Sequence, residues 1–547
     1  MAEGINWGDV PSWFSATVTL AALVFAVVAV VVARRTFRLE SGRDVDTARE
    51  RAEHQAFVRR AQAALVSAWW ARNEGHHTRH GGHSWAVYLR NASDTPVYKA
   101  ALTIVGMGQH AKKKAIELAV VPPTQAPTAH AVEIPGATAD GEQDASGHLL
   151  SEYRVSLRFT DATGLRWLRD QYGVLSALEP NLLIWTSPEG AAVVEPFTAE
   201  FLATYGVTAT FDPARIEGEL RSHFVDTPAG PDILIGPHDW VGSLVRRQLV
   251  EPITLSDERA SLFAPQYLNA CSFGGELYAV PSSLDTVALI RNTDLAPDPP
   301  ESIEQLLAVA RELRRQHEVT ELMTIPVGLL GNAFHMWPIF TSAGGWLFGR
   351  KPDGTWDPAR QGLSSPETIA AFEKIRMLGA LGIMRPEVNR VRSIEMFGKR
   401  QTAFILAASG VVVPARTSGI NFAVSPVPPF QDGSPSIPFL SVNGFYVASR
   451  GRNKVVATDL VPDYLTRSDV TESFGRSAHV VPLRLPGECD PAIADLHALC
   501  ADAVPMPTFP QIGDVLGLIG SAQVALIAGE DTVTVARDLG DRVRALF

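Results

Sequence analysis

An uncharged apolar run near the N-terminus sets the strongest limit on how this chain can fold. Between Trp13 and Ala33 no charged side chain interrupts a sequence rich in Val, Ala and Leu. A helix of this length matches the hydrocarbon core of a bilayer, which is about 30 Å thick. The alternative, a buried core helix, would not need so long an uncharged run. We expect residues 1–35 to form a transmembrane helix that contacts the lipid bilayer through residues 13–33.

The charges on the two sides of this run predict its orientation. Arg34, Arg35, Arg38 and Arg43 follow it, whereas residues 1–33 contain no Lys or Arg. A cleaved signal peptide would carry a basic segment before its apolar run, so cleavage is not expected. The positive-inside rule places the arginine-rich side in the cytoplasm. By charge alone, this is a single-pass cell-membrane protein whose C-terminal domains face the cytoplasm.

Length and composition indicate several ordered domains after this segment. The chain has 547 residues, 46% of them hydrophobic and 20% charged, which favours folded structure with more than one core. A formal net charge of -11 excludes nucleic acid as an expected partner, because such proteins present a basic face. The cysteines Cys271, Cys489 and Cys500 are too few for a disulfide framework, although Cys489 and Cys500 are far enough apart to pair.

Two different periodicities follow the apolar run. Apolar residues recur at helical spacing as far as Trp69, so residues 36–75 are predicted to form a helical stalk. From about Ser84 the period changes to two, and buried-type and polar residues alternate most clearly over 153–160. Residues 84–176 are therefore predicted to form a small β-sandwich domain.

From about residue 181, short apolar strands alternate with helical segments. Residues 182–186, 207–211 and 232–235 have the pattern of strands, and residues 193–205 have the pattern of a helix. This alternation predicts an α/β domain with a mainly parallel sheet, whose ligand sites lie beyond the carboxyl ends of the strands.

Six segments of this α/β region carry more specific patterns. They are PDILIGPHDWVG at 231–242, YAVPSSLDTVALIRN at 278–292, AFHMWP at 333–338, AGGW at 343–346, FGKRQTAF at 397–404 and MPTFPQ at 506–511. Together they resemble the bacterial solute-binding protein family 1, the maltose-binding-protein-like sugar receptors of ABC importers. The resemblance implies a two-lobed periplasmic-binding-protein-like fold of type II over residues 181–547. Lobe 1 would comprise about 181–288 and 440–488, and lobe 2 about 289–439 and 489–547.

The resemblance also implies non-covalent binding of a solute in a cleft between lobes that close by hinge motion. In sugar-binding members, carboxylates and amides bond the hydroxyls while aromatic faces cover the apolar faces of the rings. Carried to this chain, the ligand-binding candidates are Glu189, Asp239, Trp240, Asp285, Asn332 and Phe334. Asp239 has a second interpretation, as the N-cap of the helix that follows it.

The chain departs from the family at the aromatic positions. Gly236, Gly410 and Leu516 stand where the maltodextrin-binding members place stacking tryptophans, and Gly520 stands where they have an arginine. Because each stacking surface contributes about 1 kcal/mol beyond its buried area, tight maltodextrin binding is not expected. Either Trp240, Phe334 or Trp337 builds a pocket of another shape, or the cleft has lost its ligand.

No catalytic, cofactor or metal motif is found in the sequence. It contains no Gly-x-x-x-x-Gly-Lys-Ser/Thr, no His-Glu-x-x-His and no Gly-x-Ser-x-Gly pattern. The histidines at 76, 77, 80 and 83 lack a fixed ligand spacing and favour a solvated loop, and His238 is interpreted as a hydrogen-bonded turn residue. We predict a protein that is not an enzyme and needs no cofactor or metal.

Two functions remain open. In the first, a membrane-anchored solute-binding protein binds a carbohydrate and delivers it to an ABC importer permease, which requires the C-terminal domain outside. In the second, a degenerate binding-protein fold serves as a cytoplasm-facing sensor or interaction module for a partner protein. The motifs favour the first function, and the charge pattern around residues 13–33 favours the second.

Overall fold

A computed structural model describes residues 57–58, 60–77, 83–105, 114–132, 143, 149–205, 207–212, 230–352, 354–467, 480 and 490–547. They belong to two compact units, Met1–Ala177 and Leu178–Phe547. The predicted membrane span at residues 13–33 lies outside the described residues. Among the helices of the described ranges, none combines the length and the apolar character needed to cross a bilayer.

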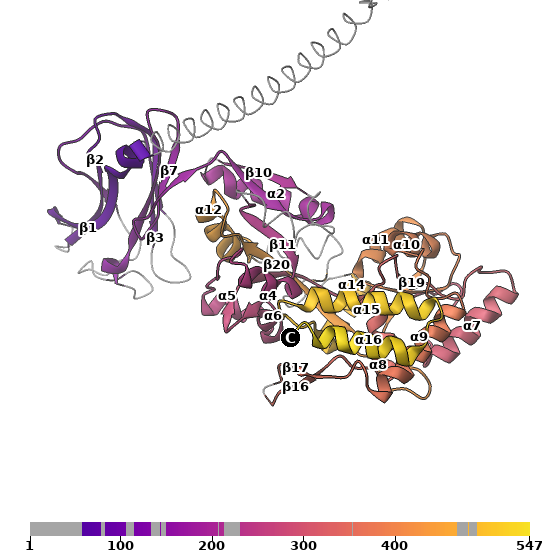
Figure 1. The fold of residues 1–547 in the computed structure, drawn as a ribbon. Helices are drawn as coiled ribbons and strands as arrows, with labels where there is room; N and C mark the ends of the chain where they lie inside the picture. The colour runs from indigo at the N-terminus through magenta and orange to yellow at the C-terminus, as the bar shows by residue number, and fades with distance from the viewer. Residues whose placement is uncertain are drawn as a thin grey trace, which may run out of the picture. The chain divides into compact units, whose positions relative to one another are not determined.

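The first unit contains two sheets that share one core (Figure 1). One sheet has the order β1-β2-β5 and the other the order β4-β3-β6-β7-β8. Buried Val87 and Leu89 of the first sheet pack in the same cluster as Leu102, Leu157 and Phe159 of the second. The strands are β1 (Val66–His77), β2 (His83–Asn91), β3 (Val97–Val105), β4 (Lys114–Val121), β5 (Thr128–Val132), β6 (Arg154–Thr160), β7 (Arg166–Arg169) and β8 (Leu175–Leu178).

The predicted helical stalk is wrong from Val66 onward. Residues 66–75 belong to β1, which pairs antiparallel with β2 and places Trp69 opposite Tyr88. Trp69 stacks on Tyr88 with ring centroids 5.8 Å apart, and Trp70 stacks on Trp85 at 5.5 Å. Cross-strand aromatic pairs of this kind stabilise a sheet. The spacing of the apolar residues in this segment also fits a helix, but the pairing of its two tryptophans across the strands favours the sheet. Residues 36–56 of the predicted stalk lie outside the described residues.

The second unit begins with a mixed sheet of order β10-β9-β11-β20-β14, with β21 beside β20. The strands β10, β9 and β11 are parallel, whereas β20 is antiparallel to both β11 and β14. The carboxyl ends of β9, β11 and β14 therefore lie at the same edge. The strands are β9 (Asn181–Trp185), β10 (Thr208–Asp212), β11 (Ile233–Pro237), β14 (Ala279–Thr286), β20 (Phe439–Val447) and β21 (Val504–Pro505). Helical elements of this region are α2 (Pro188–Tyr205), η3 (His238–Trp240), α4 (Val241–Arg246), α5 (Asp257–Ser261), α6 (Pro265–Ala270) and α12 (Lys454–Asp459).

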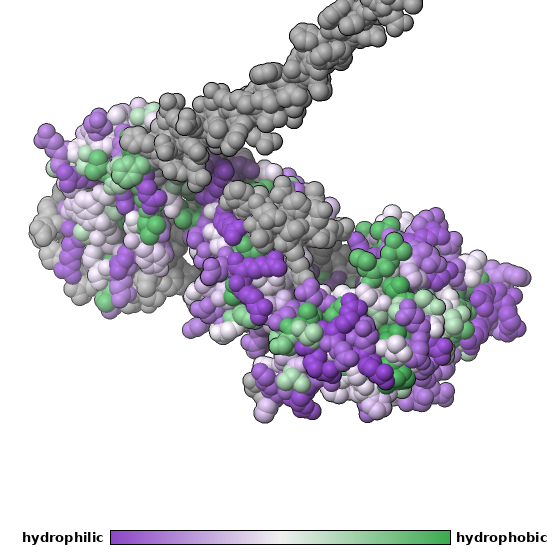
Figure 2. All heavy atoms as spheres, viewed as in Figure 1, coloured by the Kyte–Doolittle hydropathy of each residue, from purple (hydrophilic) through white to green (hydrophobic). Residues whose placement is uncertain are grey.

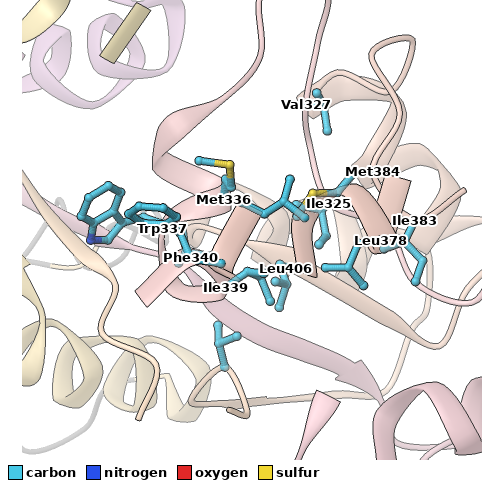
Figure 3. Packing of buried hydrophobic residues seen from close by; sticks show 14 of the residues in the cluster. Ile325, Val327, Met336, Trp337, Ile339, Phe340, Leu378, Ile383, Met384 and Leu406 are labelled. Carbon is cyan, nitrogen blue, oxygen red and sulfur yellow. The ribbon is translucent and has the colours of Figure 1, made fainter. Parts of the chain in front are cut away.

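A second sheet in this unit has the antiparallel order β18-β15-β19. Its strands are β15 (Ala288–Asn292), β18 (Phe404–Ala407) and β19 (Phe422–Ser425). Figure 3 shows side chains of α8, among them Met336, Ile339 and Phe340, packed toward Ile325 and Met384 in the core of this lobe. The helices are α7 (Ile303–Arg315), α8 (Ala333–Ser342), α9 (Pro366–Ala380), α10 (Arg390–Gly398), α11 (Val412–Thr417), α14 (Pro491–Asp502), α15 (Ile512–Ile527) and α16 (Thr532–Arg544). Short hairpins are formed by β12 (Ser272–Phe273) with β13 (Glu276–Leu277) and by β16 (Phe348–Arg350) with β17 (Trp356–Gln361).

The two sheets meet where β14 leads into β15. There the Thr286 hydroxyl donates to the carbonyl of Phe439, at the start of β20, over 2.9 Å. The ring of His238 lies close by, because its Nδ1 accepts from the Val442 amide at 3.0 Å and its Nε2 donates to the Met506 carbonyl at 3.2 Å. An amide nitrogen only donates, so these two bonds select the tautomer with the proton on Nε2. His238 is thus a hydrogen-bonded turn residue, as its sequence context indicated.

Candidate functional site

Four of the candidate ligand-binding residues lie at one edge of the first-lobe sheet. Glu189 is in the first turn of α2, which follows β9, and Asp239 and Trp240 belong to η3, which follows β11. Asp285 is the next-to-last residue of β14. These three strands end at the same edge, which is where ligand sites of open α/β sheets are found. The topology therefore groups residues that are far apart in the sequence.

Trp240 fills the space in front of Gly236. A Cβ atom placed on Gly236 would lie 2.2 Å from the indole ring of Trp240, closer than any real contact. The ring of Trp240 therefore occupies the space beside a position at which the family resemblance implies a lost tryptophan. The sequence does not reveal this, because the ring comes from a position four residues later.

Asp239 is half-buried in η3, and it is not the N-cap of either adjoining helix. The N-cap positions are Pro237 for η3 and Trp240 for α4, and neither makes a side-chain capping bond. The capping interpretation of Asp239 is therefore wrong. The charge of Asp239 contributes to raising the pKa of the Tyr446 hydroxyl, after the larger effects of burial and of Cys271.

Asp285 connects the first lobe to the second. Its Oδ1 accepts from the backbone amides of Ser409 at 2.8 Å and of Thr286 at 3.1 Å. Ser409 begins η4 (Ser409–Val411), which follows β18 of the second lobe. Burial raises the pKa of Asp285 to about 6, although the bonds from Ser409 and Thr286 and the charge of Arg390 act in the opposite direction. At neutral pH the carboxylate is therefore mostly ionised.

Asn332 and Phe334 lie at the start of α8. Asn332 is the N-cap, and its Oδ1 accepts from the amide of His335 at 3.1 Å. The backbone amide of Asn332 donates to Oε1 of Gln523 on α15 at 2.7 Å. Phe334 is half-buried and meets the ring of His335 edge to face, with centroids 5.6 Å apart. Because capping occupies the side-chain oxygen of Asn332, the group of this side chain that can bind a ligand is the amide nitrogen Nδ2.

Arg390, which sequence reasoning missed, lies beside these residues. Its Nη1 is 3.4 Å from the position that a Cβ of Gly410 would occupy. The positive charge of Arg390 lowers the pKa of both Asp285 and His335. The effect of burial is larger in both cases, and it raises the pKa of Asp285 but lowers that of His335. The charge of Arg390 thus acts on both the carboxylate at the end of β14 and a ring in the first turn of α8. No spacing in the sequence relates these three segments, so no sequence signal marks Arg390.

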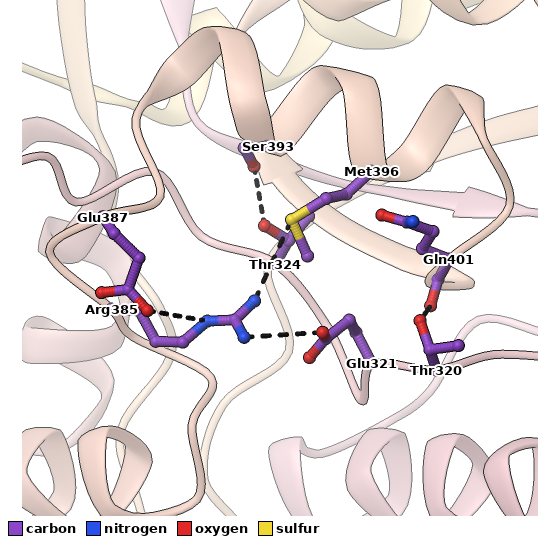
Figure 4. Close-up of polar contacts among 8 residues, drawn as sticks. All are labelled: Thr320, Glu321, Thr324, Arg385, Glu387, Ser393, Met396 and Gln401. Atoms are coloured by element: carbon purple, nitrogen blue, oxygen red, sulfur yellow. Dashed lines mark hydrogen bonds and ion pairs between the residues drawn. The ribbon is translucent and has the colours of Figure 1, made fainter.

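A polar cluster holds α10, and with it the backbone of Arg390, in place (Figure 4). The hydroxyls of Thr324 and Ser393 are 2.9 Å apart and fully buried, and Asn389 caps α10 by accepting from the amide of Arg392 at 2.9 Å. The same cluster contains Glu321, Arg385, Glu387 and Met396. Val391 on α10 and Val413 on α11 are exposed, and Figure 2 shows hydrophobic surface in this region. The surface next to Arg390 is therefore partly apolar.

Within the described ranges, no group of three or more His, Cys, Asp or Glu residues is placed to hold a metal ion. Cys271 and Cys500 are buried and form no disulfide with a described cysteine, and burial raises the pKa of both thiols. Cys489 and His80 lie outside the described residues, so the pairing of Cys489 with Cys500 stays a prediction.

Comparisons with known proteins agree with this geometry. A family model described as bacterial extracellular solute-binding protein matches residues 192–487, more than half of the chain. The maltotriose-binding protein of Pyrococcus abyssi is 27% identical over 359 residues, which cover 62% of this chain and 76% of that protein. The galactooligosaccharide-binding protein of Bacillus subtilis is 20% identical over 364 residues, which cover 64% and 85%. These findings confirm the resemblance in the motifs, and the chain belongs to the family of bacterial extracellular solute-binding proteins.

Proposed function

We propose that this protein binds a carbohydrate non-covalently between the two lobes of residues 178–547 and delivers it to an ABC importer permease. The observation that carries the proposal is the bond from Ser409 of the second lobe to Asp285 at the edge of the first-lobe sheet. The bond joins a carboxylate of the first lobe to the second lobe, and the charge of Arg390 acts both on this carboxylate and on His335 in α8. Family membership and the sugars in the names of the relatives support the same function.

Each candidate residue has a role that suits a sugar. Asp239 and Asp285 accept hydrogen bonds from hydroxyl groups, and Glu189 and Asn332 add polar contacts. The half-buried rings of Trp240 and Phe334 cover the apolar faces of the pyranose. This division between a few directed polar groups and aromatic surfaces is typical of small-molecule sites, and it requires no covalent step. The proposed function is therefore binding and not catalysis.

The replacement Asp239→Asn tests this site. We expect the purified full-length protein to bind a sugar from a panel of maltotriose, galactooligosaccharides, their monosaccharides and the acidic derivatives of these monosaccharides, measured by titration calorimetry. Loss of the carboxylate should weaken binding by about 10- to 150-fold, because a hydrogen bond to a charged group contributes about 1.5–3 kcal/mol. Asp298→Asn is the matched control, since Asp298 is exposed in a loop, and it should leave the affinity unchanged. A folded protein that binds no member of the panel would contradict the proposal.

Residues 13–33 are proposed to anchor the protein in the cell membrane, with the binding domain outside. Reporters that are active only outside or only inside the membrane, fused in turn to Phe547, test this arrangement. Activity of the outside reporter is expected, because delivery to an importer takes place on its outer face. Activity of the inside reporter alone would replace the proposal with the second function, a cytoplasm-facing sensor or interaction module. The arginines at 34, 35, 38 and 43 favour that alternative by the positive-inside rule.

A further inference from the structure

We propose that the bound solute is an acidic sugar and that Arg390 binds its anionic group. This inference rests on the proposed function and names the substrate class of the same site. It follows from what lies beside the substituted positions, from the absence of a hydrogen-bond or ion-pair partner for the Arg390 guanidinium among the described residues, and from the groups that surround it.

One of the substituted positions is filled by another side chain, a second has a side chain at contact distance, and a third is closed by backbone. The ring of Trp240 covers Gly236, and the guanidinium of Arg390 lies over Gly410. At Gly520, the space for a side chain is closed by the carbonyl of Leu330, 2.5 Å from the position of a Cβ. Near Gly410, a cation therefore stands where the family resemblance places an aromatic surface. A ligand that relies on stacking loses a contact at this point, and a ligand with a negative charge gains one.

The guanidinium of Arg390 is available to a ligand. Among the residues that the structure describes, no hydrogen bond and no ion pair to Arg390 is found, and its side chain is exposed. Arg392, two residues later on the same helix, instead pairs with Glu395 at 2.9 Å. A guanidinium presents a planar fork of donors that matches a carboxylate or a phosphate with two parallel bonds. Within the described part of the chain, the Arg390 guanidinium is thus a donor group without a bonded partner, and its backbone belongs to α10.

The neighbours of Arg390 do not neutralise it by contact. Oδ1 of Asp285 is engaged by the amides of Ser409 and Thr286. Burial lowers the pKa of His335 to about 4, with a further contribution from Arg390, so this ring is neutral at physiological pH. Arg390 interacts electrostatically with Asp285, but within the described residues no ion pair joins them. An incoming anion can therefore pair with the Arg390 guanidinium, while Asp285 and Asp239 accept bonds from the hydroxyls.

Calorimetry on the full-length protein tests the inference with glucuronate, galacturonate, glucose 6-phosphate, glucose, galactose and maltotriose. We expect an acidic sugar to bind more tightly than its neutral parent, and Arg390→Met to reduce that affinity on the order of 10- to 100-fold. Added salt should weaken the acidic sugar more than the neutral one. The comparison of uronates with the sugar phosphate shows which oxyanion is preferred. Gly410→Trp, which puts a ring in the place of the guanidinium, should weaken the acidic sugar as well.

Arg392→Met is the matched control, because it removes an equally long cation from the same helix, and it should leave binding unchanged. Neutral sugars that bind as tightly as acidic ones, with no effect of Arg390→Met, would overturn this inference and leave the proposed function standing. Failure of the folded protein to bind any sugar of the panel would overturn both.

Discussion

Replacing Gly520 by arginine, the residue of the sugar-binding relatives in the family resemblance, should destabilise residues 178–547 by about 3 kcal/mol. A Cβ on Gly520 would lie 2.5 Å from the carbonyl oxygen of Leu330 and 3.3 Å from the carbonyl carbon of Gly331. On the other side of this contact, Gly331 has a positive φ of 76°, and a Cβ added to it would collide with the carbonyl of Gly520. Two backbone segments are in direct contact here, and neither can move without displacing the start of α8. Urea unfolding of the full-length protein measures the loss.

Gly517 provides the matched control on the same helix. It is exposed on α15, and a Cβ added to it would meet no atom within 4 Å. Gly517→Ala should therefore stabilise the protein by up to about 1 kcal/mol, because glycine is the poorer helix former. Gly520→Ala should have the opposite sign. If both alanine variants stabilised the protein, the packing of α15 against residues 330–331 would be wrong.

The free energy of unfolding should rise as the pH increases from about 4 to about 6.5. His238 is 0% and His335 is 7% exposed, and burial lowers the pKa of each from 6.5 to about 4. In this interval the unfolded chain binds more protons at both histidines than the folded chain, so raising the pH favours the folded state. Each histidine contributes on the order of 3 kcal/mol across the interval. Below pH 4 both states are protonated, and this contribution to stability is absent.

Asp285 has the opposite effect on the pH dependence of the free energy of unfolding. Burial raises its pKa to about 6, so between about pH 4 and 6 the folded chain binds more protons at this group than the unfolded chain. Its contribution to stability therefore falls as the pH rises. Burial also raises the pKa of Asp232, which acts in the same direction as Asp285. The two buried histidines titrate over a wider interval, from about 4 to 6.5, and the net slope is expected to remain positive.

Unfolding by urea at a series of pH values, from 4 to 7.5, measures this slope. His238→Gln and His335→Gln should each flatten it, and Asp285→Asn should make it steeper. His317 is exposed, and His317→Gln should leave the slope unchanged. The slope is the informative quantity, because His238→Gln also changes the bonds to Val442 and Met506. A stability that is independent of pH in the wild-type protein and in both buried-histidine variants would contradict the assigned burial.

The sequence reveals features that neighbouring residues encode together. Alternation of period two over residues 153–160 coincides with β6, and the apolar segment before Gly236 forms β11. The six motifs identified the family correctly. The helical spacing up to Trp69 failed from Val66 onward, because β1 depends on pairing with β2 and not on its own periodicity. A local sequence pattern thus predicts a helix or strand correctly only where pairing with a distant segment does not favour another structure.

For the candidate site, too, some features follow from the sequence and others only from the tertiary structure. Sequence alone determined which carboxylates and aromatic residues follow the strands of the first lobe, since motif position and strand order are properties of the chain. Only the tertiary structure decided that Trp240 covers Gly236, that Arg390 lies over Gly410, and that Asp285 bonds Ser409. The physical reason is that the space beside a glycine, and the charge near a carboxylate, are set by residues distant in the sequence.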